Sequence, residues 1–257
     1  RTHEELSGKV NLDYAPAYSF LANNEHGTMT AALAAGNANN GKGISSSGFN
    51  SRLDLYELHP DPNPDSNYSF NNMLDAAMNG ARVINCSWHN GCYGFVQSQQ
   101  QIIDMIHDVY NTIIVAAAGN STCGSPTAYN YPSAYNHVIA VSGVGHRLDV
   151  TPANLACGWS YKDLHKTNYW LNVNSTQHND KVDICAPAIG VHTAIDDNTD
   201  FGYSNYRFGT SFASPMVAGV VALMLAVNPE LHHNDIDAIL KCTARDLYEL
   251  PLNMPYL

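Results

Sequence analysis

Apolar residues in this chain follow two alternating patterns, one typical of strands and one typical of helices. Short apolar runs and one alternating segment predict strands at 52–58, 82–86, 112–117, 138–142 and 182–185. Apolar residues spaced three to four positions apart predict helices at 29–35, 70–79, 96–110 and 211–228, with a last short helix beginning at Asn234. We expect Ser69 and Asn234 to cap helices and Gly80 to end one. The alternation is typical of an α/β fold with a mostly parallel sheet and helices on both faces.

The whole chain of 257 residues is predicted to form one domain. Residues 145–181 break the pattern with mixed polar and aromatic residues, which predicts a long surface excursion rather than a linker, because its aromatic side chains need a surface to pack against. The most apolar stretch, 216–227, is too short to span a bilayer and contains Gly219, so we interpret it as a core helix. The first residues are polar and resemble no signal peptide.

Composition narrows the classes of function. The formal net charge is −11 and the sequence has no Lys/Arg cluster, which argues against a nucleic-acid partner. Hydrophobic residues make up 45% of the chain, which excludes wholesale disorder, and charged residues only 14%. A surface of neutral polar groups suits a secreted hydrolase.

The six cysteines leave two interpretations open. They are Cys86, Cys92, Cys123, Cys157, Cys185 and Cys242. None forms a C-x-x-C pair, so a zinc or redox motif has little support. An even number permits up to three disulfides in an exported protein, whereas buried thiols are the alternative. Cys86 and Cys92 are close enough for a small-loop disulfide, although Cys86 lies in a predicted buried strand.

Three short segments carry candidate chemistry: His26-Gly-Thr28, Ala116-Ala-Ala-Gly-Asn120 and Gly209-Thr-Ser-Phe-Ala-Ser-Pro215. Ser211 stands at the predicted N-terminus of the apolar helix. There the unpaired N–H groups and the positive end of the helix dipole would stabilise a developing oxyanion. Taken alone, Ser211 or Thr210 would more often be a simple N-cap.

Together these segments, H-G-T, A-A-G-N and G-T-S-x-A-x-P, resemble the motifs of the subtilisin-like serine proteases, or subtilases. Further stretches match the same family in the same order: Gly43-Ile-Ser45, Asn79 to Ser87, Tyr131 to Val141 and Val182 to Pro187. The resemblance covers nearly the whole chain. It implies a three-layer subtilisin-like α/β fold and a catalytic domain spanning 1–257.

The resemblance also implies roles for individual residues. Ser211 would be the nucleophile, His26 the general base, and Asn120 the oxyanion donor together with the backbone N–H of Ser211. An extended polypeptide substrate would pair with one segment and place a side chain against a second, which forms a wall of the S1 pocket. These substrate-binding residues would be Ser87, Trp88 and His89 in the first segment, and Ala117, Ala118 and Gly119 in the second.

The sequence departs from the family pattern beside the motifs. Glu25 stands where the family usually has glycine, and Trp88-His89 replaces the usual Leu-Gly of the binding strand. Trp88 would either narrow the cleft or simply pack, and packing is the favoured interpretation. His89 is expected to lie at the rim of the cleft.

The largest departure concerns the aspartate of the catalytic triad. The family carries it in a V-x-D-[ST]-G motif well before H-G-T, and this sequence contains no such motif. Asp13 lies only 26 − 13 = 13 residues before His26 and lacks the Ser/Thr-Gly. Thr2 to Val10 resembles the segment that follows the aspartate turn. We therefore expect a domain incomplete at its N-terminal and C-terminal sides, with the Asp strand supplied by an N-terminal fragment or chain.

Other functions were weighed against this one. A pseudoprotease would keep the fold as a peptide- or protease-binding module. An α/β-hydrolase or zinc protease is disfavoured because G-x-S-x-G and H-E-x-x-H are absent. The resemblance implies no cofactor for the chemistry and allows a structural Ca²⁺, although no spaced ligand set indicates where. It also implies a secreted or cell-surface protein without a nucleic-acid or membrane partner.

Overall fold

The centre of the molecule is a five-stranded sheet that is mostly parallel. The computed structural model describes residues 3–13, 25–56, 67–121, 123–146, 169–171, 176–196 and 201–247. The sheet has the order β3-β4-β5-β6, and β7 also pairs with β5. Strands β3 (Val83–Cys86), β4 (Ile113–Ala117), β5 (Val138–His146) and β7 (Ile184–Pro187) are parallel, and β6 (Tyr169–Leu171) is antiparallel to β5.

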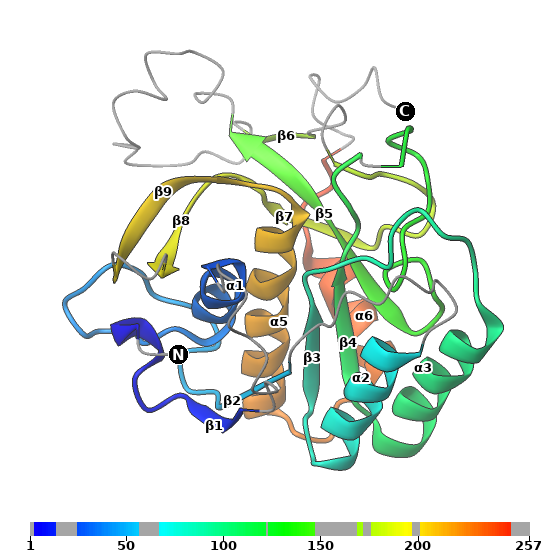
Figure 1. Cartoon of the computed structure of the whole chain (residues 1–257), viewed down its shortest axis with the longest axis horizontal. Coiled ribbons are helices and arrows are strands. Elements are labelled where there is room, and N and C mark those ends of the chain that lie inside the picture. Colours follow the sequence, from blue (N-terminus) through cyan, green and yellow to red (C-terminus); the bar gives the residue numbers. More distant parts are fainter. Residues whose placement is uncertain are drawn as a thin grey trace.

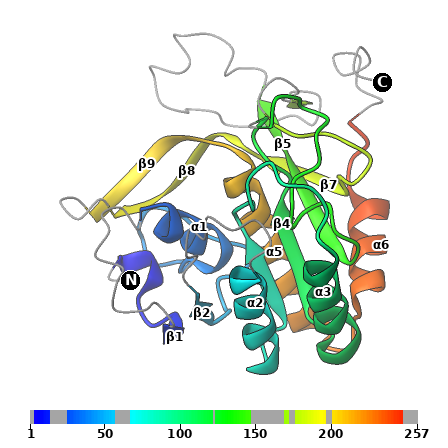
Figure 2. The same ribbon diagram turned by 45° about the vertical axis from the view of Figure 1, so that its right-hand side comes forward.

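Helices cover both faces of this sheet (Figures 1 and 2). One face carries α2 (Tyr68–Met78) and α3 (Gln97–Tyr110), and the other carries α5 (Thr210–Val227) and α6 (His233–Thr243). Strand β4 is buried throughout. Because side chains alternate along a strand, Ile113 and Val115 join the core under α5, whereas Ile114 and Ala116 join the core under α2 and α3. The predicted three-layer α/β fold is confirmed.

A second group of elements stands beside the central sheet. It comprises the 3-10 helix η1 (Glu4–Leu6), the parallel pair β1 (Val10–Asp13) and β2 (Leu53–Leu55), helix α1 (Glu25–Ala35), and the antiparallel hairpin of β8 (Ile189–Asp196) and β9 (Phe201–Phe208). Helix α1 packs against α5, and a close approach fixes this contact. A Cβ added to Gly219 of α5 would lie 2.7 Å from the Ala34 carbonyl oxygen. The glycine therefore lets the two helices meet closely enough to align His26 with the start of α5.

Several expected boundaries and caps were wrong. Helix α2 begins at Tyr68, so Ser69 lies inside it and Asn67 is the N-cap. Helix α6 is capped by His232, whose side chain and Asp235 form a capping box, so Asn234 lies inside the first turn. Gly80 follows the end of α2 with a φ of +90°, in line with the prediction. Residues 147–168 of the expected excursion lie outside the described part.

Helix α5 is the core helix that the sequence predicted. By length and composition alone its 18 residues could cross a membrane, and 56% of them are buried inside this fold. Val217, Val221 and Leu225 pack with β4, β5 and α6 in one core cluster. Burial of one side of α5 against the sheet thus accounts for its apolar sequence.

Candidate active site

The first turn of α5 is held by a residue from another part of the fold. Its N-cap, Gly209, has no side chain, so the helix must find an acceptor elsewhere. The backbone N–H of Thr210 donates to Asn120 Oδ1 at 2.8 Å, and the Thr210 hydroxyl donates to the same oxygen at 3.0 Å. Thr210 Oγ1 also accepts from the N–H of Gly119 at 3.1 Å. Asn120 therefore caps α5, and its Nδ2 group is left to donate elsewhere.

Ser211 lies in the same turn and faces the end of β3. Its hydroxyl donates to the Ser87 carbonyl oxygen at 3.4 Å, and the Ser87 hydroxyl donates to the Ser211 carbonyl oxygen at 2.8 Å. Asn85 Nδ2 donates to Ser87 Oγ at 2.9 Å, while Asn85 Oδ1 accepts from the Ser214 hydroxyl at 2.7 Å. This network fixes the start of α5 to the segment that follows β3. The helix is capped by Asn120 rather than by Ser211 or Thr210, so the simple N-cap alternative does not apply.

His26 reaches the site from the first turn of α1. Its ring lies beside that of Phe212, the neighbour of Ser211, with 5.8 Å between ring centroids. The residue is exposed, yet surrounding atoms desolvate the ring and lower the pKa of His26, while the Glu25 carboxylate acts in the opposite direction. Glu25 itself forms an ion pair with Arg207. A lowered pKa keeps the imidazole neutral, which is the form that accepts a proton.

The expected substrate-binding strand follows β3 directly. Trp88 packs against the core under α2 and α3, with its ring 5.5 Å from that of Phe70 in a T-shaped contact. His89 is exposed and accepts a hydrogen bond from the Gly91 N–H at 3.0 Å. The structure therefore places Trp88 mainly as a packing residue and His89 at the surface.

The expected S1 segment is the buried end of β4 and its turn. Ala117 and Ala118 are 5% and 2% exposed, so a substrate would reach them only at their outer edge. The Ala118 carbonyl oxygen accepts from Asn130 Nδ2 at 3.0 Å. Gly119 has a φ of +114°, and a Cβ there would lie 1.9 Å from Asn130 Nδ2. Glycine is therefore required at this turn, which aims Asn120 at α5.

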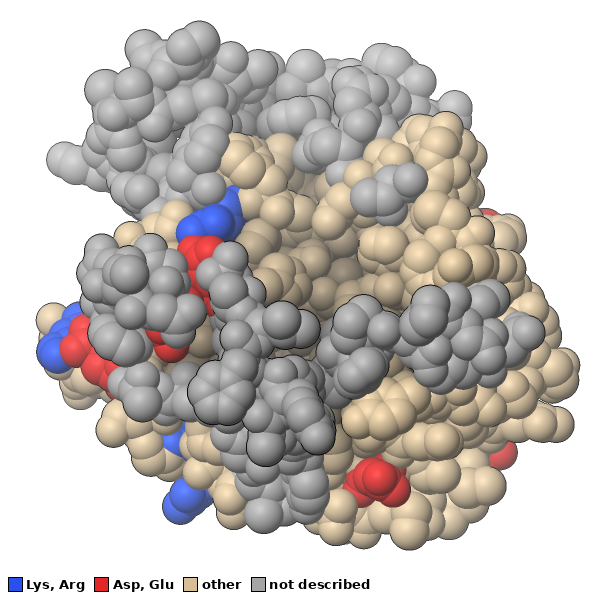
Figure 3. All heavy atoms as spheres, in the orientation of Figure 1, with Lys and Arg blue, Asp and Glu red and all other residues tan. Residues whose placement is uncertain are grey.

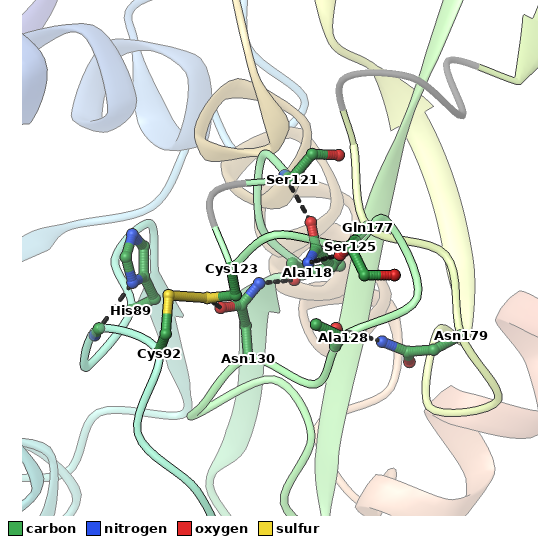
Figure 4. Close-up of a disulfide and its surroundings, with 11 residues drawn as sticks. His89, Cys92, Ala118, Ser121, Cys123, Ser125, Ala128, Asn130, Gln177 and Asn179 are labelled. Atoms are coloured by element: carbon green, nitrogen blue, oxygen red, sulfur yellow. Dashed lines mark hydrogen bonds between the residues drawn. A yellow bond between two sulfur atoms is a disulfide. The ribbon is translucent and has the colours of Figure 1, made fainter.

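A disulfide joins the loops that follow the two expected substrate-binding segments (Figure 4). Cys92, in the loop after His89, is bonded to Cys123, in the loop after Asn120, with 5.3 Å between their Cα atoms. The considered Cys86–Cys92 pairing is wrong, because Cys86 is a buried free thiol at the end of β3. Its burial raises its pKa to about 12, so this thiol is inert. Cys157 lies outside the described residues.

A deep cleft runs from the site along the open edge of β3. Its volume is about 1230 Å³, and both His26 and Ser87 line it. Within the described sheet β3 pairs with β4 alone, and three of its four residues are only half-buried. Strand β2 lines the opposite side of the cleft. Figure 3 shows one face of the molecule with a hollow lined by uncharged residues, while the visible Lys, Arg, Asp and Glu residues lie outside the hollow.

Neither Asp13 nor a group of metal ligands lies at the candidate site in the described part of the chain. Asp13 ends β1, where it is paired with Leu55 of β2. It belongs to the outer strand of that pair, so the edge of β3 is not paired with it. Within the described ranges no three or more His, Cys, Asp or Glu residues form a group that could hold a metal ion. The calcium hypothesis therefore gains no location there.

Comparison with known proteins identifies the family. The sequence profile of the subtilase family, peptidase S8, matches residues 2–255. The chain belongs to the subtilase family. The thermophilic serine proteinase of Bacillus sp. strain AK1 is 31% identical over 87% of this chain and 49% of its own length. The cell wall-associated protease of Bacillus subtilis is 26% identical over 96% of this chain and 24% of its own length.

A solved subtilase has the same fold. Fervidolysin from Fervidobacterium pennivorans superposes with a TM-score of 0.74 over 95% of this chain and 37% of its own, at 23% identity. The present chain thus spans about half or less of these relatives. The two Bacillus relatives are named as a serine proteinase and a protease.

Of the residues that the motifs singled out, Ser211 contacts Ser87, Asn120 contacts Thr210 in the same turn of α5, and the ring of His26 lies beside that of Phe212. The motifs did not reveal Thr210, whose backbone and hydroxyl orient Asn120. They also missed the buried Gln177, whose side chain accepts from the Ser121 N–H and donates to the Ser125 carbonyl oxygen at 2.9 Å (Figure 4). Such supporting residues cannot be found from local motifs, because their contacts are with residues far away in the sequence.

Proposed function

We propose that this chain is the core of a serine endopeptidase that uses Ser211 as nucleophile, His26 as general base and Asn120 as oxyanion donor. The observation that carries the proposal is the capping of α5 by Asn120. It ties the side-chain carbonyl to Thr210 and leaves the amide N–H groups beside Ser211. A donor fixed before the reaction begins stabilises charge without reorganisation.

The reaction follows from these positions. Ser211 Oγ attacks the scissile carbonyl carbon while its proton passes to His26, and the carbonyl π electrons move onto oxygen. Asn120 Nδ2 and the Ser211 backbone N–H donate to that oxyanion. The proton on His26 then goes to the leaving amine as the C–N bond breaks. Water then attacks the acyl carbon while His26 takes its proton, the bond between Ser211 Oγ and the acyl carbon breaks as His26 returns that proton to Oγ, and the acid is released.

An extended polypeptide is the substrate class that fits the strand end. The segment Ser87–His89 would pair with a substrate backbone by strand addition, and the edge of Ala117–Gly119 would border the P1 side chain. An extracellular or cell-wall location is supported by the disulfide between Cys92 and Cys123 and by the name of the Bacillus subtilis relative. We propose no cofactor for this chemistry.

We further propose that the triad aspartate arrives on an extended segment that fills the cleft beside β3. Both sides of the cleft are strands, and one face of β3 is incompletely covered. Small residues of α1 and α5 line it and leave room for larger side chains; they are Ala31, Ala34, Ala35, Ala218, Gly219 and Ala222. A strand lying here would satisfy the open edge of β3 and end beside His26.

The alternative is a pseudoprotease that binds a peptide or protease. One observation favours it: the Ser211 hydroxyl donates to the Ser87 carbonyl oxygen rather than to His26. Catalytic hydrogen bonds are often loose in the absence of substrate, and no carboxylate orients His26 in the described structure. The endopeptidase therefore remains the better supported proposal.

Covalent labelling tests the function directly. A fluorophosphonate probe should label the wild-type protein when the aspartate segment is present, because only an activated serine attacks it. Intact-mass spectrometry should show one adduct, and peptide mapping should place it on Ser211. The Ser211→Ala variant should remain unlabelled, while the control Ser125→Ala, at a half-buried position in the loop after Asn120, should label like wild type. A folded, segment-bound protein without an adduct would favour the pseudoprotease.

A further inference from the structure

Three histidines that are far apart in the sequence meet on the side of the molecule away from Ser211. The rings of His107 and His137 are stacked with 4.0 Å between centroids. The ring of His233 meets that of His107 edge-on at 5.2 Å and that of His137 at 6.3 Å. His107 belongs to the last turn of α3, His137 precedes β5, and His233 begins α6. The cluster thus joins three elements.

His233 belongs to the side of α6 that faces the core. It is 7% exposed, and Ile236 and Leu240 follow it at helical spacing, both buried in the cluster with Val221 of α5. No hydrogen-bond partner for the buried Nδ1 of His233 exists among the described residues. Protonating this ring would place a charge where nothing in the described structure accepts its hydrogen bond.

The charges around His233 come from every element packed against it. Helix α3 contributes the titratable side chains of His107, Asp104 and Asp108, and the segment before β5 contributes His137. On α6 itself they are Asp237 and Lys241, and Lys241 also forms an ion pair at 2.6 Å with Asp183, which precedes β7. Asp104 and Asp108 contact the rings of His137 and His107 rather than that of His233.

These surroundings favour the neutral imidazole. Burial, followed by the positive charges of His107, His137 and Lys241, lowers the pKa of His233 to about 4, and Asp237 opposes this only in part. The described histidines do not form a group that could hold a metal ion, so a metal does not account for the cluster. Proton uptake is the remaining chemistry that three adjoining imidazoles share.

We propose that the His107–His137–His233 cluster is an acid-sensitive lock, which holds α6 against α3 and the core only while His233 is neutral. Acid would charge adjoining rings that repel one another, and His233 would leave its buried position to reach water. Helix α6 would then separate from α5, whose first turn carries Ser211. The histidine cluster would thus make the packing of α5 and α6 depend on the external pH.

The direction of the effect follows from proton binding. In the unfolded chain a histidine has a pKa of about 6.5, whereas in the folded chain that of His233 is about 4. Between these values the unfolded state binds more protons, so stability falls as the pH falls. The contribution is fully present above about pH 6.5 and is lost as the pH approaches 4. One proton raises the unfolding equilibrium constant by up to about tenfold per pH unit in this window.

The test uses the full chain with Ser211→Ala, which prevents self-digestion, and compares urea unfolding at several pH values between 7 and 4. His233→Leu keeps an apolar side chain facing the core but cannot take up the proton. The unfolding equilibrium constant of His233→Leu should therefore rise less steeply on acidification than that of the parent. The difference between the two should be up to about tenfold per pH unit. The control His192→Gln removes an exposed histidine of β8 and should retain the parent slope.

Two further measurements keep the proposal testable if His233→Leu does not fold. Histidine NMR should show the His233 ring titrating below pH 5, and His137→Gln, at a partly exposed position, should raise that midpoint by removing a repelling neighbour. Amide exchange, corrected for its intrinsic pH dependence, should accelerate in α6 at a higher pH than in β4. Equal acid slopes in parent and His233→Leu, or a His233 ring that titrates near pH 6.5, would overturn the proposal.

Discussion

At the scale of single residues, the side-chain amide of Asn120 has two roles, one structural and one proposed for the chemistry. Its oxygen caps α5 through Thr210, and its nitrogen is the proposed oxyanion donor. Asn120→Ala should lose both roles. The missing cap should lower the free energy of unfolding by about 1 kcal/mol. The missing donor should lower kcat by about 10²–10³ with little change in KM, a magnitude taken from subtilisin itself.

Asn120→Asp separates the two roles. Aspartate can still accept from Thr210 at the N-terminus of α5, where its charge is also favourable, but it cannot donate to an oxyanion. Stability should therefore be retained while kcat falls as in Asn120→Ala. Peptide hydrolysis kinetics and urea unfolding of both variants, each with the aspartate segment supplied, provide the comparison. A fully active Asn120→Asp enzyme would show that the amide is only a cap.

Sequence motifs could predict His26, Asn120 and Ser211 because each stands in a short segment that resembles subtilases. They could not predict the partners of these residues. Only the folded chain shows that the Thr210 hydroxyl donates to Asn120 from 90 positions away. The histidine cluster was invisible for the same reason, since His107, His137 and His233 share no spacing pattern.

At the scale of elements, the disulfide joins the two loops that flank the site. The bond between Cys92 and Cys123 closes a loop with a sequence separation of 31. Loop-closure entropy predicts that the double variant Cys92→Ser/Cys123→Ser loses roughly 3–4 kcal/mol of unfolding free energy. Urea unfolding without reductant measures this loss. Cys242→Ser, which removes an exposed free thiol, should leave stability unchanged, and so should added reductant in the double variant.

The elements themselves were predicted where periodicity is strong and missed where it is weak. Strands β3, β4 and β7 and helices α3 and α5 lie close to the expected ranges because each buries a continuous run or one clear face. The hairpin of β8 and β9 was not predicted, since its residues mix apolar, polar and aromatic types. Caps failed at α2 and α6, where Asn67 and His232 precede the expected residues. Local sequence rules do not show which of several neighbouring polar residues becomes the N-cap.

At the scale of the whole molecule, the cleft between β2 and β3 separates two groups of elements that a further strand would join. Its sides are backbone, and much of its lining is alanine and glycine, which suits the side chains of an inserted strand better than a compact ligand. Strand β3 is about 13 Å long at about 3.3 Å per residue, so a segment of roughly four to six residues would match it. The end nearest Ser87 would carry the aspartate.

A pair of synthetic peptides tests this arrangement. Each is an extended segment of six residues, rich in valine and isoleucine, and the pair differs only in an aspartate or asparagine at the end nearest Ser87. Both peptides should slow amide exchange in β3, because strand pairing needs only the backbone. Only the aspartate peptide should accelerate fluorophosphonate labelling of Ser211, by up to about 10⁴, since asparagine cannot stabilise the imidazolium of His26.

A blocked cleft provides the matched control. Ala222 of α5 lines the cleft and is half-buried, so Ala222→Phe should fill the space without touching Ser211, His26 or Asn120. In that variant neither peptide should protect β3, and the labelling rate should stay at its level without peptide. If both peptides protect β3 but the aspartate peptide does not accelerate labelling, a strand binds in the cleft and the triad aspartate does not lie at its end. Failure of both peptides to protect β3 in the unblocked protein would remove the strand proposal, because an open strand edge beside an apolar cleft should accept such a segment.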